Sequence, residues 1–112
     1  MNFQVGQGIL GKTRFKDGVM AKYKRTFLVV SVQSDYIEVL NVSSTAGKET
    51  KLLFPYNMEL KLYNPPFLKP CFVKLDSLMK LHKSEWKKFS ILNKGNKLDE
   101  SEMKKILSKI LR

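Results

Sequence analysis

The sequence predicts a small, mainly β domain that ends in one α-helix, and three observations lead to this prediction. Short runs of β-branched and aromatic residues recur through most of the chain. Gly, Pro, Asn and Asp separate these runs at close spacing, as turns do. The last segment instead repeats its apolar residues with the helical period. A chain of 112 residues has room for one hydrophobic core, so we expect a single domain over residues 1–112.

The first predicted strand lies within residues 6–15, where β-forming residues are mixed with three glycines. Glycines inside a strand often mark a bend or the corner of a barrel. The segment lacks the full glycine spacing and the flanking strand and helix of a dinucleotide-binding loop, so we do not expect one. Residues 16–18 predict a turn, and residues 19–24 predict a lead-in to the next strand.

A hairpin is predicted in the middle of the chain. Residues 26–32 form a continuous β-branched and aromatic run, which is typical of a buried central strand. Residues 33–35 supply a turn, and residues 36–42 predict the antiparallel partner. The polar residues 43–48 then end the second strand.

Four shorter extended segments follow the hairpin. The first is predicted to start at residues 52–54, and the other three are predicted to cover residues 60–63, 70–76 and 86–92. Two adjacent prolines, Pro65 and Pro66, end any strand before them. Five or six short strands with close turns, followed by one helix, predict a strongly bent antiparallel sheet or small barrel of the SH3-like kind.

The final segment predicts an amphipathic α-helix that begins after Asp99. Asp99 is a favourable N-cap residue, and Glu102 three residues later gives a motif similar to a capping box. One helical face is apolar, and its members are Met103, Ile106, Leu107, Ile110 and Leu111. We expect this face to pack on the sheet.

The charge of the chain favours an acidic partner. Lys and Arg number 21 against 10 Asp and Glu, which gives a formal net charge of +11 and a pI near 9.8. A pI above about 9 is typical of nucleic-acid-binding domains. The plainer alternative is a small basic protein with no specific partner. Binding to a membrane surface would need aromatic residues on a basic amphipathic helix, and the predicted helix has none.

The sequence predicts neither a disulfide nor a metal centre. Cys71 is the only cysteine, and its apolar neighbours favour a buried core position over a nucleophilic pair with His82. His82 is the only histidine, and the acidic residues lack ligand spacing, so we expect no metal and no cofactor. The start of the chain does not resemble a signal peptide and no segment approaches the ~18 apolar residues of a membrane span, so we expect a cytoplasmic protein.

The best candidate site lies at one end of the predicted hairpin. Lys24 and Arg25 precede its first strand, and residues 43–45 end its second strand. In an antiparallel hairpin these two positions lie side by side. A guanidinium surrounded by hydroxyl groups is suited to a phosphate, because the guanidinium offers a fork of donors and the hydroxyls add further donors. The alternatives are a solvated strand end at Arg25 and an ordinary polar turn at residues 43–45.

In order and spacing, these segments resemble the MazF/PemK/Kid-type toxins of bacterial toxin–antitoxin pairs. The matching segments are residues 25–31, 39–45, 71–78 and 95–102, and the likeness extends over roughly residues 5 to 112. It implies a PemK/MazF-type barrel and a sequence-specific, metal-independent endoribonuclease, or mRNA interferase. Such an enzyme cleaves single-stranded RNA by attack of the substrate's 2′-hydroxyl. The resemblance also implies a homodimer with a basic RNA groove, which an acidic antitoxin covers.

Carried onto this sequence, the resemblance implies roles for individual residues. Arg25 would stabilise the scissile phosphate, and Ser44 or Thr45 would donate hydrogen bonds to its oxygens. The further residues expected to contact RNA are Lys22, Tyr23, Lys24 and Ser43.

The sequence departs from the family pattern in three places. Thr26 stands where a proline usually follows the arginine, and the usual upstream acidic residue has no clear counterpart, Asp17 being the nearest. Residues 63–69 lie outside the pattern, and no general base is assigned. Two alternatives therefore stay open. One is a non-catalytic nucleic-acid-binding module that stacks bases on Tyr23, Phe27 or Tyr36. The other is a protein-interaction domain with a basic face.

Overall fold

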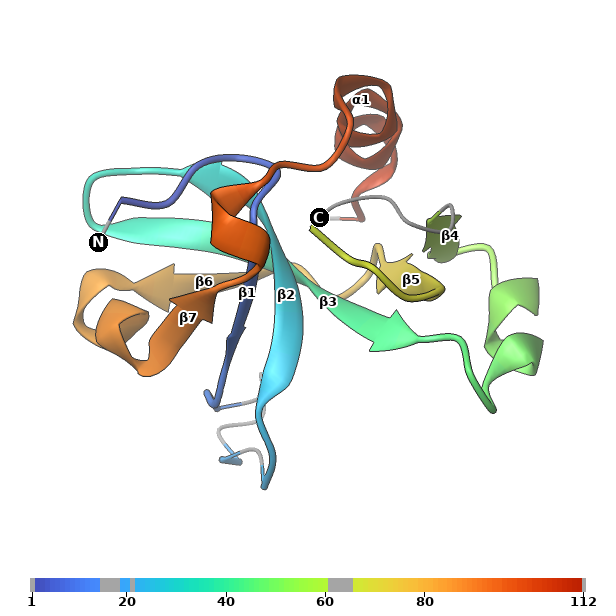
Figure 1. Ribbon diagram of the computed structural model, residues 1–112, viewed down its shortest axis with the longest axis horizontal. Helices are drawn as coiled ribbons and strands as arrows, with labels where there is room; N and C mark the ends of the chain where they lie inside the picture. The colour runs from blue at the N-terminus through green and yellow to red at the C-terminus, as the bar shows by residue number, and fades with distance from the viewer. Residues whose placement is uncertain (1, 15–18, 21, 61–65, 112) are drawn as a thin grey trace.

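The computed structural model describes residues 2–14, 19–20, 22–60 and 66–111, and in these residues it forms an antiparallel β-sheet of seven strands with one C-terminal helix (Figure 1). The strands are β1 (Gly8–Gly11), β2 (Arg25–Val32), β3 (Tyr36–Ser44), β4 (Asn57–Leu60), β5 (Cys71–Lys74), β6 (Met79–His82) and β7 (Phe89–Ile91). The helices are the 3₁₀ turns η1 (Glu49–Leu53), η2 (Lys83–Lys88) and η3 (Asn93–Gly95) and the α-helix α1 (Glu100–Lys109). The predicted mainly β class with a C-terminal helix is confirmed.

The long strand β3 holds the two halves of the sheet together. The strand order is β4-β5-β3-β2-β1-β7, and β6 pairs with β3 beside this path. β5 pairs with β3 from Val42 to Ser44, whereas β6 pairs with the opposite end of β3, from Tyr36 to Val39. Among the described residues the sheet is strongly bent but not closed into a barrel (Figure 1). The coarse prediction of a bent sheet is therefore confirmed, and closure is not seen.

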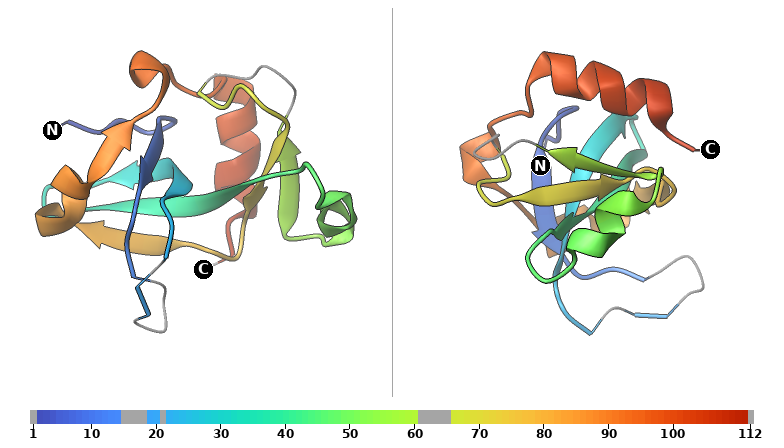
Figure 2. Two further views of the ribbon diagram at one scale, coloured as in Figure 1. Left: turned by 60° about the horizontal axis from the view of Figure 1, so that its bottom comes forward. Right: turned by 90° about the vertical axis from the view of Figure 1, so that its right-hand side faces the viewer.

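Two apolar clusters pack on opposite faces of β2, because successive side chains of a strand point to opposite faces. Leu28 and Val30 join a cluster with Ile106 of α1. Phe27 and Val29 join a second cluster that includes Phe89 of β7. Figure 2 shows α1 lying along one side of the sheet. One face of β2 therefore packs in the cluster that includes α1, and the other face packs in the second apolar cluster.

The helix begins where the sequence predicts, but its apolar face is only partly buried. The carboxylate of Asp99 accepts a hydrogen bond of 3.2 Å from the amide of Ser101. Met103 and Ile106 are buried, whereas Leu107 and Leu111 are exposed. Leu111 lies beyond the last helical residue, and its amide donates a hydrogen bond to Leu75 instead. The helical period therefore no longer sets the direction of its side chain. None of the helices among the described residues is long and apolar enough to cross a membrane.

Several local predictions were wrong or fall outside the described residues. In the segment predicted to start a strand at residues 52–54, Leu52 and Leu53 belong to η1 and Phe54 follows it. Leu53 is 83% exposed, so it packs against no apolar layer. The strand predicted over residues 60–63 begins earlier, as β4. Residues 61–63 and the predicted turn at residues 16–18 lie outside the described residues. Residues 86–88 belong to η2, so only β7 is extended there, and β6 was not predicted.

Candidate functional site

The register of the sheet brings the start of β2 beside the end of β3, as the sequence predicts. Thr26 lies opposite Val42, so Arg25 lies level with the last residues of β3. Ser43 and Ser44 in turn pair with Phe72 and Cys71 of β5. Arg25 and the two serines therefore come from neighbouring positions at one end of the sheet.

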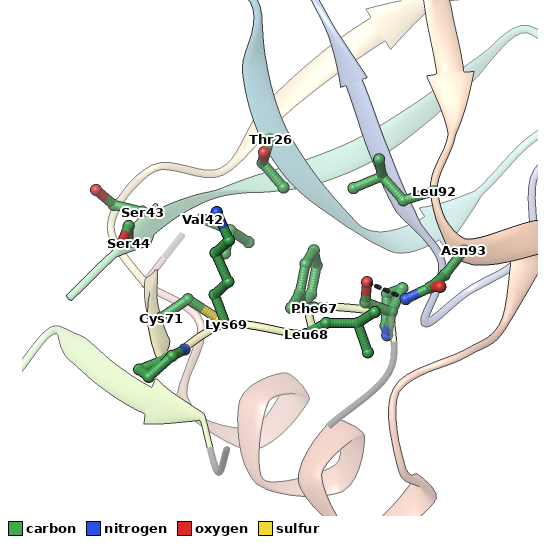
Figure 3. A pocket seen from close by; sticks show the side chains of 12 residues that line it. Thr26, Val42, Ser43, Ser44, Phe67, Leu68, Lys69, Cys71, Leu92 and Asn93 are labelled. Carbon is green, nitrogen blue, oxygen red and sulfur yellow. Dashed lines mark hydrogen bonds between the residues drawn. The ribbon is translucent and has the colours of Figure 1, made fainter. Parts of the chain in front are cut away.

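The three hydroxyl residues do not share one surface. Ser43 and Ser44 are neighbours in β3, so their side chains point to opposite faces of the strand, although both border the pocket drawn in Figure 3. Thr45 is only 6% exposed, and its amide donates a hydrogen bond to the carbonyl of Pro70. By strand alternation, Ser43 shares the face of Arg25 and Phe27. Ser44 and Thr26 lie on the other face.

The face of Ser44 lines a mostly apolar pocket, here called the Phe67 pocket. Its volume is about 510 Å³, and its lining includes Thr26, Ser43, Ser44, Phe67 and Lys69 (Figure 3). Asn93 fixes one rim of the pocket by donating a hydrogen bond of 2.8 Å to the carbonyl of Pro66. The pocket combines an aromatic ring with one cation, so it suits a partly apolar ligand.

Cys71 at the wall of this pocket is a core residue. It is buried, and its burial raises the pKa of the thiol to about 11. Cys71 pairs with Ser44 and His82 pairs with Tyr36, so their partners are eight residues apart along β3. At about 3.3 Å per residue this is roughly 26 Å. A nucleophilic pair of Cys71 with His82 is therefore excluded.

The face of Ser43 lines a second pocket with a volume of about 310 Å³, here called the Lys74 pocket. Its walls come from the end of β3, from η1 and the turn after it, and from β4 and β5. The lining residues are Ser43, Lys48, Lys51, Phe54, Tyr56, Asn57, Phe72, Lys74 and Asp76. Three of its nine lining residues are lysines, so this pocket is strongly cationic.

The pKa of Lys74 reflects its burial and the positive charges around this pocket. Burial lowers the pKa of its ammonium group, and the positive charges of Lys48 and Arg25 lower that pKa further. Asp76 opposes this effect, and Lys51 adds to it. Arg25 is thus close enough to Lys74 to act on its charge. The predicted arginine and an unpredicted lysine belong to one cationic cluster.

Hydrogen bonds and ring contacts hold the side chains of the Lys74 pocket in place. Lys48 Nζ donates a hydrogen bond of 3.1 Å to Ser43 Oγ. The rings of Phe54 and Tyr56 stack with centroids 5.5 Å apart, and Lys51 Nζ lies 5.5 Å from the Phe54 centroid. Asn57 Nδ2 donates 2.8 Å to the carbonyl of Lys51, while its buried Oδ1 has no hydrogen-bond partner among the described residues. An unsatisfied acceptor of this kind is often completed by water or a ligand.

The other residues that the sequence proposed for RNA contact lie apart from both pockets. Lys22, Tyr23 and Lys24 form an exposed segment before β2, with Tyr23 72% exposed, and they are not among the residues that line either pocket. Phe27 is buried in the core, so the interpretation of it as a stacking platform was wrong. Tyr36 lies at the far end of β3, where Lys80 Nζ covers its ring at 4.7 Å.

Most of the Lys74 pocket was missed in the sequence. The missed residues of this pocket are Lys48, Lys51, Phe54, Tyr56, Asn57 and Lys74. Lys69, which lines the Phe67 pocket, was missed as well. One available signal was the predicted strand at residues 70–76, in which Lys74 interrupts an apolar run on the face of Phe72. The other was the spacing of Lys48 and Lys51, which places both cations on one turn.

No group of three or more His, Cys, Asp or Glu side chains that could hold a metal ion occurs in the part of the chain that the structure describes. Among protein-family models and curated proteins, none matches the chain.

Proposed function

We propose that this chain binds single-stranded RNA at the end of the sheet where Arg25 meets the Lys74 pocket. The observation that carries the proposal is the effect of Arg25, Lys48 and Lys51 on Lys74: four cations of the cluster repel one another around one small pocket. A phosphodiester placed there would relieve this repulsion and accept hydrogen bonds from the guanidinium and the ammonium groups. Ser43 adds a hydroxyl beside Lys48.

The shape and composition of the site favour a single strand over a duplex. The Lys74 pocket is small, and its walls combine lysines with aromatic rings. Unpaired bases stack on such rings, whereas a duplex presents its phosphates and keeps its bases stacked inside. The resemblance noted in the sequence points to the same ligand, because it implies single-stranded RNA.

Binding of a labelled single-stranded RNA oligonucleotide tests this proposal. Arg25→Ala should weaken binding by about tenfold, since a hydrogen-bonded charge is lost from the phosphate site. Arg25→Lys should recover only part of this loss, because a point charge lacks the guanidinium fork. Thermal melts of both variants serve as the control for folding. Wild-type protein that binds no RNA at low salt would refute the proposal.

A second candidate function is metal-independent cleavage of the bound RNA, which Lys74 favours. Lys74 is partly buried in the cationic pocket, so its ammonium lies where negative charge would develop on a bound phosphodiester, and no general base is assigned in the sequence. The 2′-hydroxyl would lose its proton to a general base that is not assigned, and its oxygen would attack the phosphorus while Arg25 and the charged Lys74 stabilise the developing charge. The bond to the 5′-oxygen breaks, that oxygen gains a proton, and a cyclic phosphate remains. Cleavage in the presence of EDTA tests this step.

The remaining expectations from the resemblance belong to the same proposal. We propose that the bent sheet corresponds to the SH3-like, PemK/MazF-type barrel, that two copies associate as a homodimer, and that an acidic antitoxin covers the basic surface in the cytoplasm. A chain with a net charge of +11 attracts such a partner in a salt-dependent way. Sedimentation that gives only monomer at micromolar concentration would contradict the dimer.

A protein-interaction domain is the other alternative. In that case the acidic protein partner would hold the basic face without any need for RNA. A competition experiment distinguishes RNA binding from protein binding at this face. If RNA and the acidic partner share one site, each should displace the other.

A further inference from the structure

We infer that Phe54 is a stacking platform for an unpaired nucleobase whose phosphate lies in the Lys74 pocket. This inference rests on the proposed RNA binding and names a contact that the sequence did not suggest. It predicts that the protein distinguishes RNA with unpaired bases from RNA without them, which a purely electrostatic site does not do.

The exposure of the two stacked rings differs in a way that suits a platform. Tyr56 packs against the apolar cluster under α1, so the core holds its ring. Phe54 lies on Tyr56 with an angle of 3° between the ring planes, yet Phe54 is 41% exposed. A planar ring that is supported from inside and open to solvent can continue a stack with a base. Base–aromatic stacking of this kind is used by proteins that bind single strands.

The backbone around the rings is fixed by hydrogen bonds. The amide of Phe54 donates 3.2 Å to the carbonyl of Lys51, and the amide of Asn57 donates 3.0 Å to the carbonyl of Phe54. The carbonyl of Tyr56 accepts a hydrogen bond of 2.7 Å from the amide of Leu75. The ring of Phe54 is therefore presented by an anchored turn, so that little order has to be gained when a base binds.

The cations of the same pocket place a phosphate beside this ring. Phe54, Lys48 and Lys74 line one pocket of about 310 Å³, so a base on the ring keeps its own phosphate within the cationic cluster. Lys51 Nζ lies 5.5 Å from the ring centroid, at a distance typical of a cation–π contact. A base that takes this place releases Lys51 toward the phosphate. Stacking and charge neutralisation then act on one nucleotide.

The other exposed aromatic residues fit this role less well. Tyr36 lies at the opposite end of β3 and is not among the residues that line the Lys74 pocket. Tyr23 is more exposed than Phe54, but it is not among the residues that line the Lys74 pocket. Phe54 combines an open ring with adjacent cations.

Three fluorescein-labelled RNAs of equal length test the inference: a single strand, the same strand with abasic sites throughout, and the duplex. Phe54→Ala should weaken binding of the single strand by about tenfold, which is the usual size of one lost stack. The same variant should change binding of the abasic strand and of the duplex by less than twofold. Leu53→Ala is the matched control, because Leu53 is the more exposed apolar neighbour and stacks on no ring.

A second variant covers the case in which Phe54→Ala does not fold. Phe54→Trp keeps a planar ring, so it should retain affinity, and the fluorescence of the new tryptophan should be quenched by the single strand but not by the abasic strand. Equal losses with all three RNAs, or no loss, would overturn the inference alone. If wild-type protein binds none of the RNAs, the proposed function fails and the inference fails with it.

Discussion

Lys48 donates its hydrogen bond to the hydroxyl oxygen of Ser43, and this contact joins a residue that the sequence suggested to one that it did not. Because the oxygen of Ser43 accepts from the ammonium, the hydroxyl hydrogen is directed elsewhere and can be donated to an anion. Lys48 is held near the end of β3 by the same contact. The pair thus presents two donors at the mouth of the Lys74 pocket, next to Arg25.

Ser43 and Ser44 give the sharpest test of which sheet face binds RNA. Ser43→Ala should weaken binding of single-stranded RNA about tenfold, because the donor is lost and Lys48 is no longer held. Ser44→Ala changes the neighbouring residue on the opposite face, so the affinity should change by less than twofold. Fluorescence anisotropy measures both. The reverse order of effects would assign the phosphate to the Phe67 pocket and to Ser44.

Binding of RNA should take up protons at a pH near the pKa of Lys74 in the free protein. Burial and the nearby charges of Lys48 and Arg25 lower the pKa of Lys74 in the free protein. A bound phosphate favours the charged amine and raises that pKa, so Lys74 gains protons as the complex forms. Affinity should therefore fall as the pH rises through the pKa of the free Lys74. Titration calorimetry in buffers of different ionisation enthalpy measures the uptake, and Lys74→Met should abolish it.

The thiol of Cys71 should be unreactive in the native protein. Its burial raises the pKa to about 11, so the folded chain keeps the thiol neutral at pH values where the unfolded chain begins to ionise it. Iodoacetamide at pH 9 should label Cys71 far faster in urea than in buffer. The contribution of this protonated thiol to stability is complete below the unfolded pKa and is lost as the pH rises through about 11. Cys71→Ala should remove that part of the pH dependence.

Gly11 is required by the close approach of β1 to β7. A Cβ atom there would lie 2.6 Å from Phe89 Cδ1 and 2.7 Å from the carbonyl oxygen of Lys88. Gly11→Ala should lower the free energy of unfolding by about 1–3 kcal/mol, as overpacking usually does. Gly47→Ala is the control, because no atom lies within 4 Å and only its φ of +73° is unfavourable, at about 1–2 kcal/mol. Urea denaturation measures both, and a Gly11→Ala variant as stable as the wild type would contradict the packing argument.

Elements that depend on residues close together in the sequence were predicted correctly. The β2–β3 hairpin follows from two apolar runs around a turn, and α1 follows from its cap at Asp99 and its helical period. The segment around Leu53 was predicted wrongly, because three apolar residues before a proline have the composition of a strand, yet none of the described strands pairs with them. Pairing partners far away in the chain decide such cases.

The candidate site was predicted only where it depends on the hairpin. Arg25 and Ser43 meet because antiparallel neighbours must. Lys74 joins them through the pairing of β5 with β3, and Lys48 joins them through the turn after β3, neither of which has a local signal. Ser44 lies on the other face of the sheet from Ser43, because successive side chains of a strand alternate.

The dependence of RNA affinity on salt, in two variants of equal charge, shows whether the Lys74 pocket holds the RNA. The double variant Lys48→Gln/Lys74→Met removes two charges from the Lys74 pocket, and Lys104→Gln/Lys109→Gln removes two from α1, outside that pocket. We predict that the pocket variant loses affinity at least tenfold and that its slope of log K against log salt falls by about 0.7 for each lost phosphate contact. The helix variant should keep the wild-type slope. Equal slopes and equal losses in the two variants would mean that general basicity, and not this site, holds the RNA.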